Sequence, residues 1–385
     1  MFRKTVTLIL LLAAILVFTG CASMLDGEYT AVTKHQESSE MPGDNNSVRA
    51  ISTYDELQRA LSGFVSEHTR TGLLRFYDYD GELEDDLELA CLEISRNTPL
   101  GAYAVDYMSS SLTRIVSYYE AEISINYKRA KSQIDDIVTA VSKEAFNIAL
   151  YNTLKDFDSA LVVSTDVITI TEESIREFIE KSYYENPLDI VVIPTTTIEM
   201  FPDNADKRIV EITHNYEYSV RNLETMKTAF SDRIKEVAQE IEVVDTGTAL
   251  LELCNAVCEI TEYDGSSAGS IEYNRQNRLF TAYGVFVDEL ALGEGYAMAY
   301  KALCDLLDLE CYVVIGRLND VMHAWNIVEL EGDYYHVDVS MCDENGIEAA
   351  FLKSDSDIRN EYWWDTENYN KCDGLLTYFD ISERQ

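Results

Sequence analysis

The sequence predicts an α+β fold: a duplicated α+β module followed by a C-terminal domain with its own helices and strands. Two observations indicate this arrangement. One pattern of apolar and turn residues occurs twice within residues 51–243, and residues 293–338 read as a helix followed by strands. A chain of 385 residues is also long enough for two or three domains.

The duplication is visible in two pairs of matching segments. Leu73–Asp78 matches Leu161–Asp166 at an offset of 88 residues, and Glu122–Tyr127 matches Glu211–Tyr216 at an offset of 89. A fixed period with matching apolar positions indicates a repeated supersecondary unit. We therefore expect each copy to contain a strand, a helix, two strands and a second helix, in that order.

The periodicity of apolar residues places these elements. Alternation predicts strands at Ala102–Tyr107 and Ile190–Ile198, whereas spacings of three and four predict the closing helix of each copy. The matching helical positions are Ile134, Ile137 and Val141 in the first copy and Leu223, Met226 and Phe230 in the second. The acidic residues within 82–86 lack the ligand spacing of a calcium loop and are expected in the first turn of a helix, so no metal is predicted.

The N-terminus reads as an export signal. A cationic head precedes the apolar stretch Val6–Phe18, which is too short for a typical membrane span. The following Thr19-Gly20-Cys21 resembles the lipobox of bacterial lipoproteins, which implies acylation of Cys21 and an extracytoplasmic, lipid-anchored protein. A plain signal peptide or an uncleaved anchor is the alternative. The polar residues from 22 to 50 cannot bury a core and are expected to form a disordered tether.

The charge balance excludes one class of partner. The chain has 69 acidic against 30 basic side chains, a formal net charge of −39. Nucleic-acid and anionic-lipid surfaces are bound through clustered basic residues, so neither is an expected partner. The expected partners are the membrane, through the lipid on Cys21, and an extracellular protein, peptide or cell-wall ligand.

The cysteines do not form the pattern of a disulfide scaffold. Eight are present, and lipidation of Cys21 leaves an odd number spread over a long chain. Cys254 and Cys258 lie one helical turn apart without a second pair of zinc ligands nearby. A disulfide between Cys342 and Cys372 stays open, and no cofactor is predicted.

Residues 244–385 contain the candidate chemistry. A hairpin formed by Phe280–Val287 and Leu290–Leu292 is expected to lead into a helix that begins at Gly293. Strands follow, and His323 opens one strand while Asp338 ends the next. A helix start, a histidine and a carboxylate in this order are typical of a nucleophile, base and orienting group.

Three motifs carry a family resemblance: Glu294-Gly-Tyr-Ala297, His323-Ala-Trp-Asn326 and Tyr335-His-Val-Asp338. In this order they resemble the core of bacterial transglutaminase-like proteins, a branch of the papain-like cysteine enzymes. The resemblance covers roughly Asp245 to Gly374 and implies a papain-like fold. It also implies that His323 is the base, that Asp338 orients it, and that the nucleophilic cysteine of the family falls at Gly293.

The glycine at this position removes the nucleophile. A thiol at a helix start is activated by the helix dipole, and the amides stabilise the oxyanion after attack. Gly293 supplies amides without sulfur, so the acyl-enzyme route is closed. Cys304 lies about 16 Å further along the helix and cannot substitute. Attack by Cys342, or by water activated by His323, remains as an alternative.

We therefore predict a degenerate enzyme that binds a peptide, a protein or a cell-wall component in the former cleft. The alternatives are an active extracellular peptidase or transamidase, and a structural adaptor that binds through the duplicated module. His336 is interpreted as a packing residue and not as a metal ligand. The candidate site residues are His323, Asp338 and the vacated Gly293, with Tyr296, Trp325, Asn326 and Tyr335 as cleft residues. The predicted segments are a signal peptide (1–20), a tether (21–50), two module copies (51–145 and 146–243) and a transglutaminase-like domain (244–385).

Overall fold

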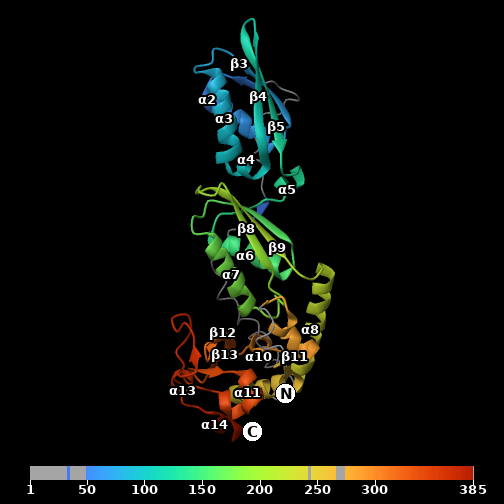
Figure 1. Ribbon diagram of the computed structural model, residues 1–385, viewed down its shortest axis with the longest axis vertical. Coiled ribbons are helices and arrows are strands. Elements are labelled where there is room, and N and C mark those ends of the chain that lie inside the picture. The colour runs from blue at the N-terminus through green and yellow to red at the C-terminus, as the bar shows by residue number, and fades with distance from the viewer. Residues whose placement is uncertain (1–32, 35–48, 242–243, 266–273, 385) are drawn as a thin grey trace, which may run out of the picture. The chain divides into compact units, whose positions relative to one another are not determined.

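The computed structural model describes residues 33–34, 49–241, 244–265 and 274–384 (Figure 1). The predicted signal peptide, Cys21 and most of the predicted tether lie outside these residues. The chain divides into two compact units. Unit 1 comprises Met1–Ala149, Val162–Ile168 and Met200–Val210, and unit 2 comprises Leu150–Leu161, Thr169–Glu199 and Glu211–Gln385. Among the described helices, none has the length and apolarity needed to cross a bilayer.

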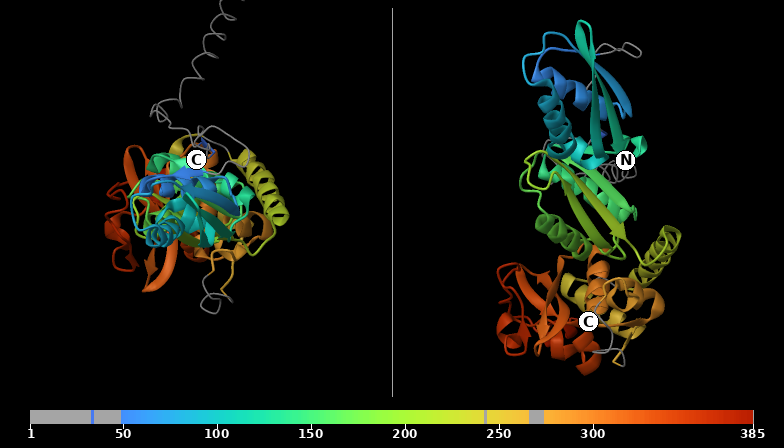
Figure 2. Two further views of the ribbon diagram at one scale, coloured as in Figure 1. Left: turned by 90° about the horizontal axis from the view of Figure 1, so that it is seen from above. Right: turned by 45° about the horizontal axis from the view of Figure 1, so that its top comes forward.

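Unit 1 contains a four-stranded sheet with the order β2-β3-β5-β4. Its strands are β2 (Arg49–Ile51), β3 (Thr71–Phe76), β4 (Val105–Ile115) and β5 (Tyr118–Tyr127). The helices α2 (Tyr54–Ser66) and α3 (Leu83–Asn97) cover one face of this sheet (Figure 2). Their apolar residues and those of β3 and β5 form one buried core, since strand residues alternate between the two faces.

A second sheet has five strands in the order β1-β6-β7-β9-β8. These strands are β1 (Thr33–Lys34), β6 (Val138–Ala140), β7 (Ala160–Thr165), β8 (Thr195–Phe201) and β9 (Arg208–Asn215). The accompanying helices are α4 (Pro99–Ala104), α5 (Lys131–Asp135), α6 (Lys143–Lys155), α7 (Glu172–Glu185) and α8 (Val220–Glu240). The expected order strand, helix, two strands, helix is present as β7-α7-β8-β9-α8, whereas the first copy has an additional helix, α4, in the series β3-α3-α4-β4-β5-α5.

Three expectations for the duplicated module are wrong in detail. Of the strand expected at Ile190–Ile198, only residues 195–198 belong to β8. Residues Ala102–Ala104 are helical and not part of a strand, because the side chain of Thr98 caps α4 and Pro99 occupies its first position. The closing helix of the first copy ends at Asp135, and Val138–Ala140 forms β6 instead. The second copy has the long helix that its periodicity predicts, α8.

The rest of unit 2 is built around α10 (Gly293–Leu306), in which every residue from Gly293 to Cys304 is buried. It packs against α9 (Thr246–Ile260) and against a sheet with the order β14-β13-β12-β15. These strands are β12 (Cys311–Leu318), β13 (Val321–Leu330), β14 (Asp333–Val337) and β15 (Tyr362–Trp363). Short elements complete the unit: β10 (Glu262–Tyr263), β11 (Leu290–Ala291), α11 (Val339–Asn345), α12 (Ile347–Ala350), α13 (Asp355–Ile358) and α14 (Tyr378–Ser382).

The predicted strand at Phe280–Val287 is wrong. Arg278–Phe280 forms a short 3₁₀ turn, and Gly284–Asp288 forms one turn of π-helix before β11. Gly284 explains part of the difference, because a Cβ there would lie 2.2 Å from the carbonyl oxygen of Arg278. The close approach of two backbone segments at this glycine replaces the extended pairing that alternation predicts.

A buried histidine in unit 2 makes the stability of the fold depend on pH. His214 is 3% exposed, and burial lowers its pKa from 6.5 to about 4. Between these two values the unfolded chain binds a proton that the folded chain excludes, so stability falls as pH decreases from about 6.5 to 4. We expect a loss of about 3 kcal/mol from this group. Urea unfolding at a series of pH values should show that the free energy of unfolding changes less with pH in His214→Gln than in the native chain. An unchanged dependence on pH would contradict this assignment.

Candidate functional site

The candidate site begins at the first turn of α10. Leu292 is the N-cap residue and provides no side-chain hydrogen bond to this turn. The amides of a first turn have no partner inside their own helix, and the positive end of the helix dipole lies there. Since α10 is buried on all sides, packing and not capping determines where this turn points.

His323 and Asp338 come together from neighbouring strands. His323 lies near the start of β13, and Asp338 directly follows β14, the antiparallel neighbour of β13. The Nε2 atom of His323 lies 2.6 Å from Oδ2 of Asp338. Because the carboxylate accepts at Nε2, this nitrogen carries the proton of a neutral imidazole and Nδ1 carries the lone pair.

Asp338 is a buried carboxylate with four donors. Oδ2 accepts from His323 and from the hydroxyl of Tyr362 at 2.8 Å, and Oδ1 accepts from the hydroxyl of Ser340 at 2.8 Å and the amide of Met341 at 3.2 Å. Burial alone would raise the pKa of Asp338, but the charge of His323 and these hydrogen bonds lower it below its ordinary value. The group is therefore an anion at neutral pH and favours a correctly oriented imidazole.

The His323 ring faces Gly293. A Cβ added to Gly293 would lie 3.0 Å from Cε1 and 3.1 Å from Nδ1 of His323, and 3.6 Å from Oγ of Ser340. Contacts of 3.0 to 3.1 Å are tighter than ordinary van der Waals distances. A side chain at position 293 would therefore require the ring to move by a few tenths of an ångström. Within the described residues, Nδ1 of His323 has no hydrogen-bond partner.

No sulfur is among the three atoms nearest to the position of this missing Cβ. Cys342 is 1% exposed, and its thiol contacts the carbonyl oxygen of Ile347 at 3.5 Å. Cys304 is fully buried and lies beside Cys311, away from the helix start. Cys342 and Cys372 are both free thiols, so the disulfide that the sequence left open does not form in this structure.

The four predicted cleft residues are all buried, and of the four Trp325 lines the cavity beside Asp338. Tyr296 and Asn326 are 0% exposed, and Trp325 and Tyr335 are 1% exposed. The hydroxyl of Tyr296 donates to Asp343 at 2.7 Å, and the amide of Asn326 donates to the carbonyl of Ala297 at 3.0 Å. The hydroxyl of Tyr335 accepts from the amide of Leu376 at 3.4 Å. Contact of these residues with a ligand stays a prediction.

Residues that sequence reasoning did not assign to the site also shape it. Glu294, the second residue of α10, is 6% exposed and accepts from the hydroxyl of Tyr184 at 2.9 Å. Arg275 lies 3.7 Å from the same carboxylate and 2.6 Å from Glu180. Both Tyr184 and Glu180 belong to α7 of the second module copy. No local pattern could have indicated a contact between residues 110 positions apart.

Tyr362 is the second such residue. It lies on β15, and its ring packs edge-on against His323 and Trp325. Together with its hydrogen bond to Asp338, this fixes both members of the retained pair. The sequence signal was the aromatic run Tyr362–Trp364 in the tail, which does not specify the carboxylate that the tyrosine contacts.

A cavity of about 460 Å³ adjoins Asp338. Its size falls within the range of small-ligand sites. Trp325 and His336 contribute its buried wall, and Met341, Ile358 and Tyr362 contribute apolar surface near the carboxylate. The rim has both signs of charge, with Lys353, Asp357 and Glu361.

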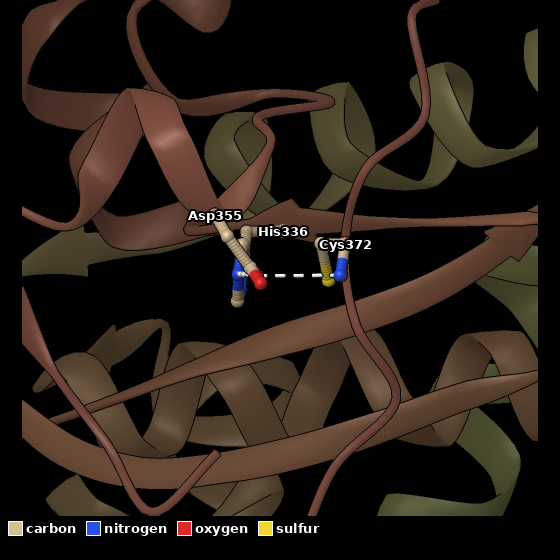
Figure 3. A group of neighbouring side chains, drawn as sticks. All are labelled: His336, Asp355 and Cys372. Carbon is tan, nitrogen blue, oxygen red and sulfur yellow. Dashed lines mark hydrogen bonds and ion pairs between the residues drawn. The ribbon is translucent and has the colours of Figure 1, made fainter.

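A second histidine, His336, belongs to a group that resembles a metal site. His336, Asp355 and Cys372 place one potential ligand atom each within 4.8 Å of one another (Figure 3). However, Nδ1 of His336 accepts from the indole N–H of Trp325 at 3.0 Å. An indole can only donate, so the proton of a neutral His336 must sit on Nε2, where it donates to Asp355 at 3.0 Å.

This hydrogen-bond pattern disfavours a metal ion. A metal on Nε2 would require the proton on Nδ1, where it would face the N–H of Trp325. The Cys372 thiol also stays protonated, because burial and the nearby Asp355 raise its pKa. The cluster is therefore a structural link between β14 and the C-terminal tail, in agreement with the interpretation of His336 as a packing residue.

The described chain is thus a mixed α+β fold in which a helix start, a histidine and a carboxylate converge. In structural comparison it is similar to a TGase crystal structure, with 12% identity over 57% of this chain and 60% of that chain and a TM-score of 0.27. It is also similar to a protein from Cytophaga hutchinsonii whose name provisionally assigns it to the cysteine proteases. Here the identity is 14% over 41% of this chain and 65% of the other, with a TM-score of 0.25.

Both similarities concern the fold alone, and the chain spans less than two thirds of each of these structures. No protein-family model matches the sequence. No curated protein matches it either. The function proposed below therefore depends on the geometry of the described residues.

The contact between Tyr362 and Asp338 predicts a pH-dependent contribution to stability. We expect Tyr362→Phe to lower the free energy of unfolding by about 1–2 kcal/mol at neutral pH, because a buried carboxylate loses one donor. Because the pKa of Asp338 is lowered in the folded state, the ionised carboxylate stabilises the fold at pH values above its ordinary pKa, and this stabilisation is lost as pH falls. The difference in free energy of unfolding between the native chain and Tyr362→Phe should therefore shrink in acid. Tyr334→Phe is the matched control, since that hydroxyl donates to the exposed Glu310. Equal losses in both variants of a urea titration would refute the assignment.

Proposed function

We propose that this protein is an extracytoplasmic lipoprotein whose C-terminal domain is a degenerate transglutaminase-like or cysteine-protease-like enzyme. In this proposal the domain binds a peptide, a protein or a cell-wall component in the former active-site cleft. The observation that carries the proposal is the position of Gly293. It lies at the start of a buried helix, opposite an imidazole that a buried carboxylate orients.

Covalent catalysis requires a nucleophile that meets the base and the oxyanion donors together. The atoms nearest to the missing Cβ are carbon and nitrogen of His323 and the hydroxyl oxygen of Ser340. That hydroxyl donates to Asp338, so it supports the carboxylate and is not paired with the base. Cys342 hydrogen-bonds to a backbone carbonyl instead, which weakens the alternative of an active thiol enzyme.

The same geometry suits reversible binding. The first turn of α10 offers backbone donors at the positive end of the helix dipole, which favour a carboxylate or a carbonyl oxygen. Nδ1 of His323 adds an acceptor when neutral and a donor when protonated. A peptide bond or a chain-terminal carboxylate presents matching groups. The cavity beside Asp338, whose lining includes neither Gly293 nor His323, has room for a small side chain or sugar.

Restoring the missing thiol tests whether the cleft is still competent for chemistry. We expect Gly293→Cys to react with iodoacetamide at least about tenfold faster than the native cysteines, because a thiol there would lie at the positive end of the helix dipole and beside His323. The His323 ring must withdraw by a few tenths of an ångström to admit the new Cβ. Gly293→Ala introduces the same crowding without sulfur and serves as the control.

Adding His323→Ala to Gly293→Cys should remove most of this reactivity, since the imidazole can no longer hold the thiolate. The proposal of a degenerate enzyme also requires that the native chain has no amidase or transamidase activity. An amidase or transamidase activity of the unmodified protein that His323→Ala abolishes would overturn it in favour of water attack. Labelling of the native protein that Cys342→Ala removes would favour the thiol alternative.

The proposed location depends on Cys21. We expect Cys21→Ala to abolish metabolic incorporation of a labelled fatty acid and to release the protein from the membrane fraction, because the lipid is the proposed anchor. Cys91→Ala is a suitable control, since that thiol is buried in unit 1. Unchanged lipid labelling and membrane association in Cys21→Ala would contradict the lipoprotein assignment and leave the binding proposal intact.

A further inference from the structure

The outer strand of the unit 1 sheet, β4, has an unusually open edge. It is 11 residues long, about twice the average strand, and lies at the end of the order β2-β3-β5-β4. Within the described residues, β4 pairs only with β5. Its central residues Ser109–Ser111 are exposed. Proteins usually protect such edges with lysine, proline or a covering segment, because unpaired backbone groups recruit another strand.

The edge also leaves apolar surface partly uncovered. Met108 and Leu112 lie opposite Ile125 and Ala121 of β5, on the face that packs against the unit 1 core. Both are only partly buried, whereas their neighbours on β5 are buried. A strand added beside β4 would cover these two side chains, which lie symmetrically on either side of Ser110.

The charges on β4 are arranged with the same symmetry. Asp106 and Arg114 each lie four residues from Ser110, and both are exposed; Asp106 is the extra residue of a β-bulge between Val105 and Tyr107, where the register with β5 shifts. Asp106 accepts a hydrogen bond from Asn126, and Arg114 stacks over the ring of Tyr119. Neither forms an ion pair within the described part of the chain. They are the only two charged residues of β4.

From this pattern we propose that β4 is the docking surface for a second copy of this chain, paired antiparallel about a two-fold axis at Ser110. In this register Asp106 lies opposite Arg114 of the partner subunit, and Met108 lies opposite Leu112 of the partner subunit. Symmetry produces each of these pairs twice, as an isologous contact requires. Opposite charges and apolar pairs placed directly across a strand pair are the interactions that stabilise a sheet.

The predicted dimer is weak and depends on salt. The formal charge of −39 per chain makes two copies repel each other at long range. Salt screens this repulsion over about 8 Å at physiological ionic strength, while the strand contact acts at shorter distance. An extended peptide could pair with the same edge, but it would not require the mirror symmetry of charge and apolar residues around Ser110.

Cysteine cross-linking of the full-length chain tests the register. Ser110→Cys places two identical residues directly opposite each other, at a Cα separation of about 5 Å that suits a disulfide. Ser111→Cys is the matched control, because the two introduced thiols would then lie diagonally across the strand pair at roughly 7–8 Å, beyond that range. Under mild oxidation we expect covalent dimer from the first variant at several times the yield of the second. Equal yields would overturn the proposal.

Charge reversal tests the pairing independently by sedimentation equilibrium. Arg114→Asp and Asp106→Arg each place like charges opposite one another twice per dimer, so each should weaken association about tenfold or more. The double variant exchanges the two charges and should restore the native affinity. A chain that is monomeric at about 1 mM in physiological salt would overturn the proposal. The proposal would also fail if neither single reversal weakened association. If an added peptide bound in that case, peptide pairing at this edge would be favoured instead.

Discussion

The buried carboxylate of Asp338 constrains the whole C-terminal half of unit 2. Its four donors come from β13, from the first turn of α11 and from β15. A buried anion is tolerated only when it is paired and hydrogen-bonded, so each of these elements must be in place before the others are stable. This requirement fixes the strand that carries His323 relative to α11 and β15. The site geometry is therefore a consequence of satisfying one charge.

Because of this constraint, the pairing of His323 with Asp338 contributes to stability whether or not the pair takes part in a reaction. Loss of His323 would remove one of the four donors of the buried Asp338 carboxylate, which destabilises the fold. The contribution of the pair to stability is thus independent of any reaction. The space at Gly293 is tight but not filled, since a Cβ there would lie 3.0 Å from Cε1 of His323 and would require a shift of a few tenths of an ångström.

The sequence predicted the central part of this site well and its surroundings poorly. His323 and Asp338 could be placed together because one opens a strand and the other ends the next, and adjacent antiparallel strands bring such positions into contact. The contact of Tyr184 with Glu294 could not be predicted, because it depends on how α7 packs against α10 and no local periodicity encodes that. The strand expected at Phe280–Val287 failed for a similar reason. Alternating apolar residues are also compatible with an irregular helical turn when both faces are buried, as Val285 and Phe286 are.

The two histidines of this sheet show why residue type alone does not identify a functional group. Both His323 and His336 hydrogen-bond a carboxylate through Nε2. The difference lies at Nδ1, where His336 meets the indole N–H of Trp325 and His323 faces a glycine. His336 therefore has both nitrogens occupied by the protein, whereas His323 keeps a lone pair directed at the start of a helix. Of the two arrangements, the second leaves a ring nitrogen available to a ligand.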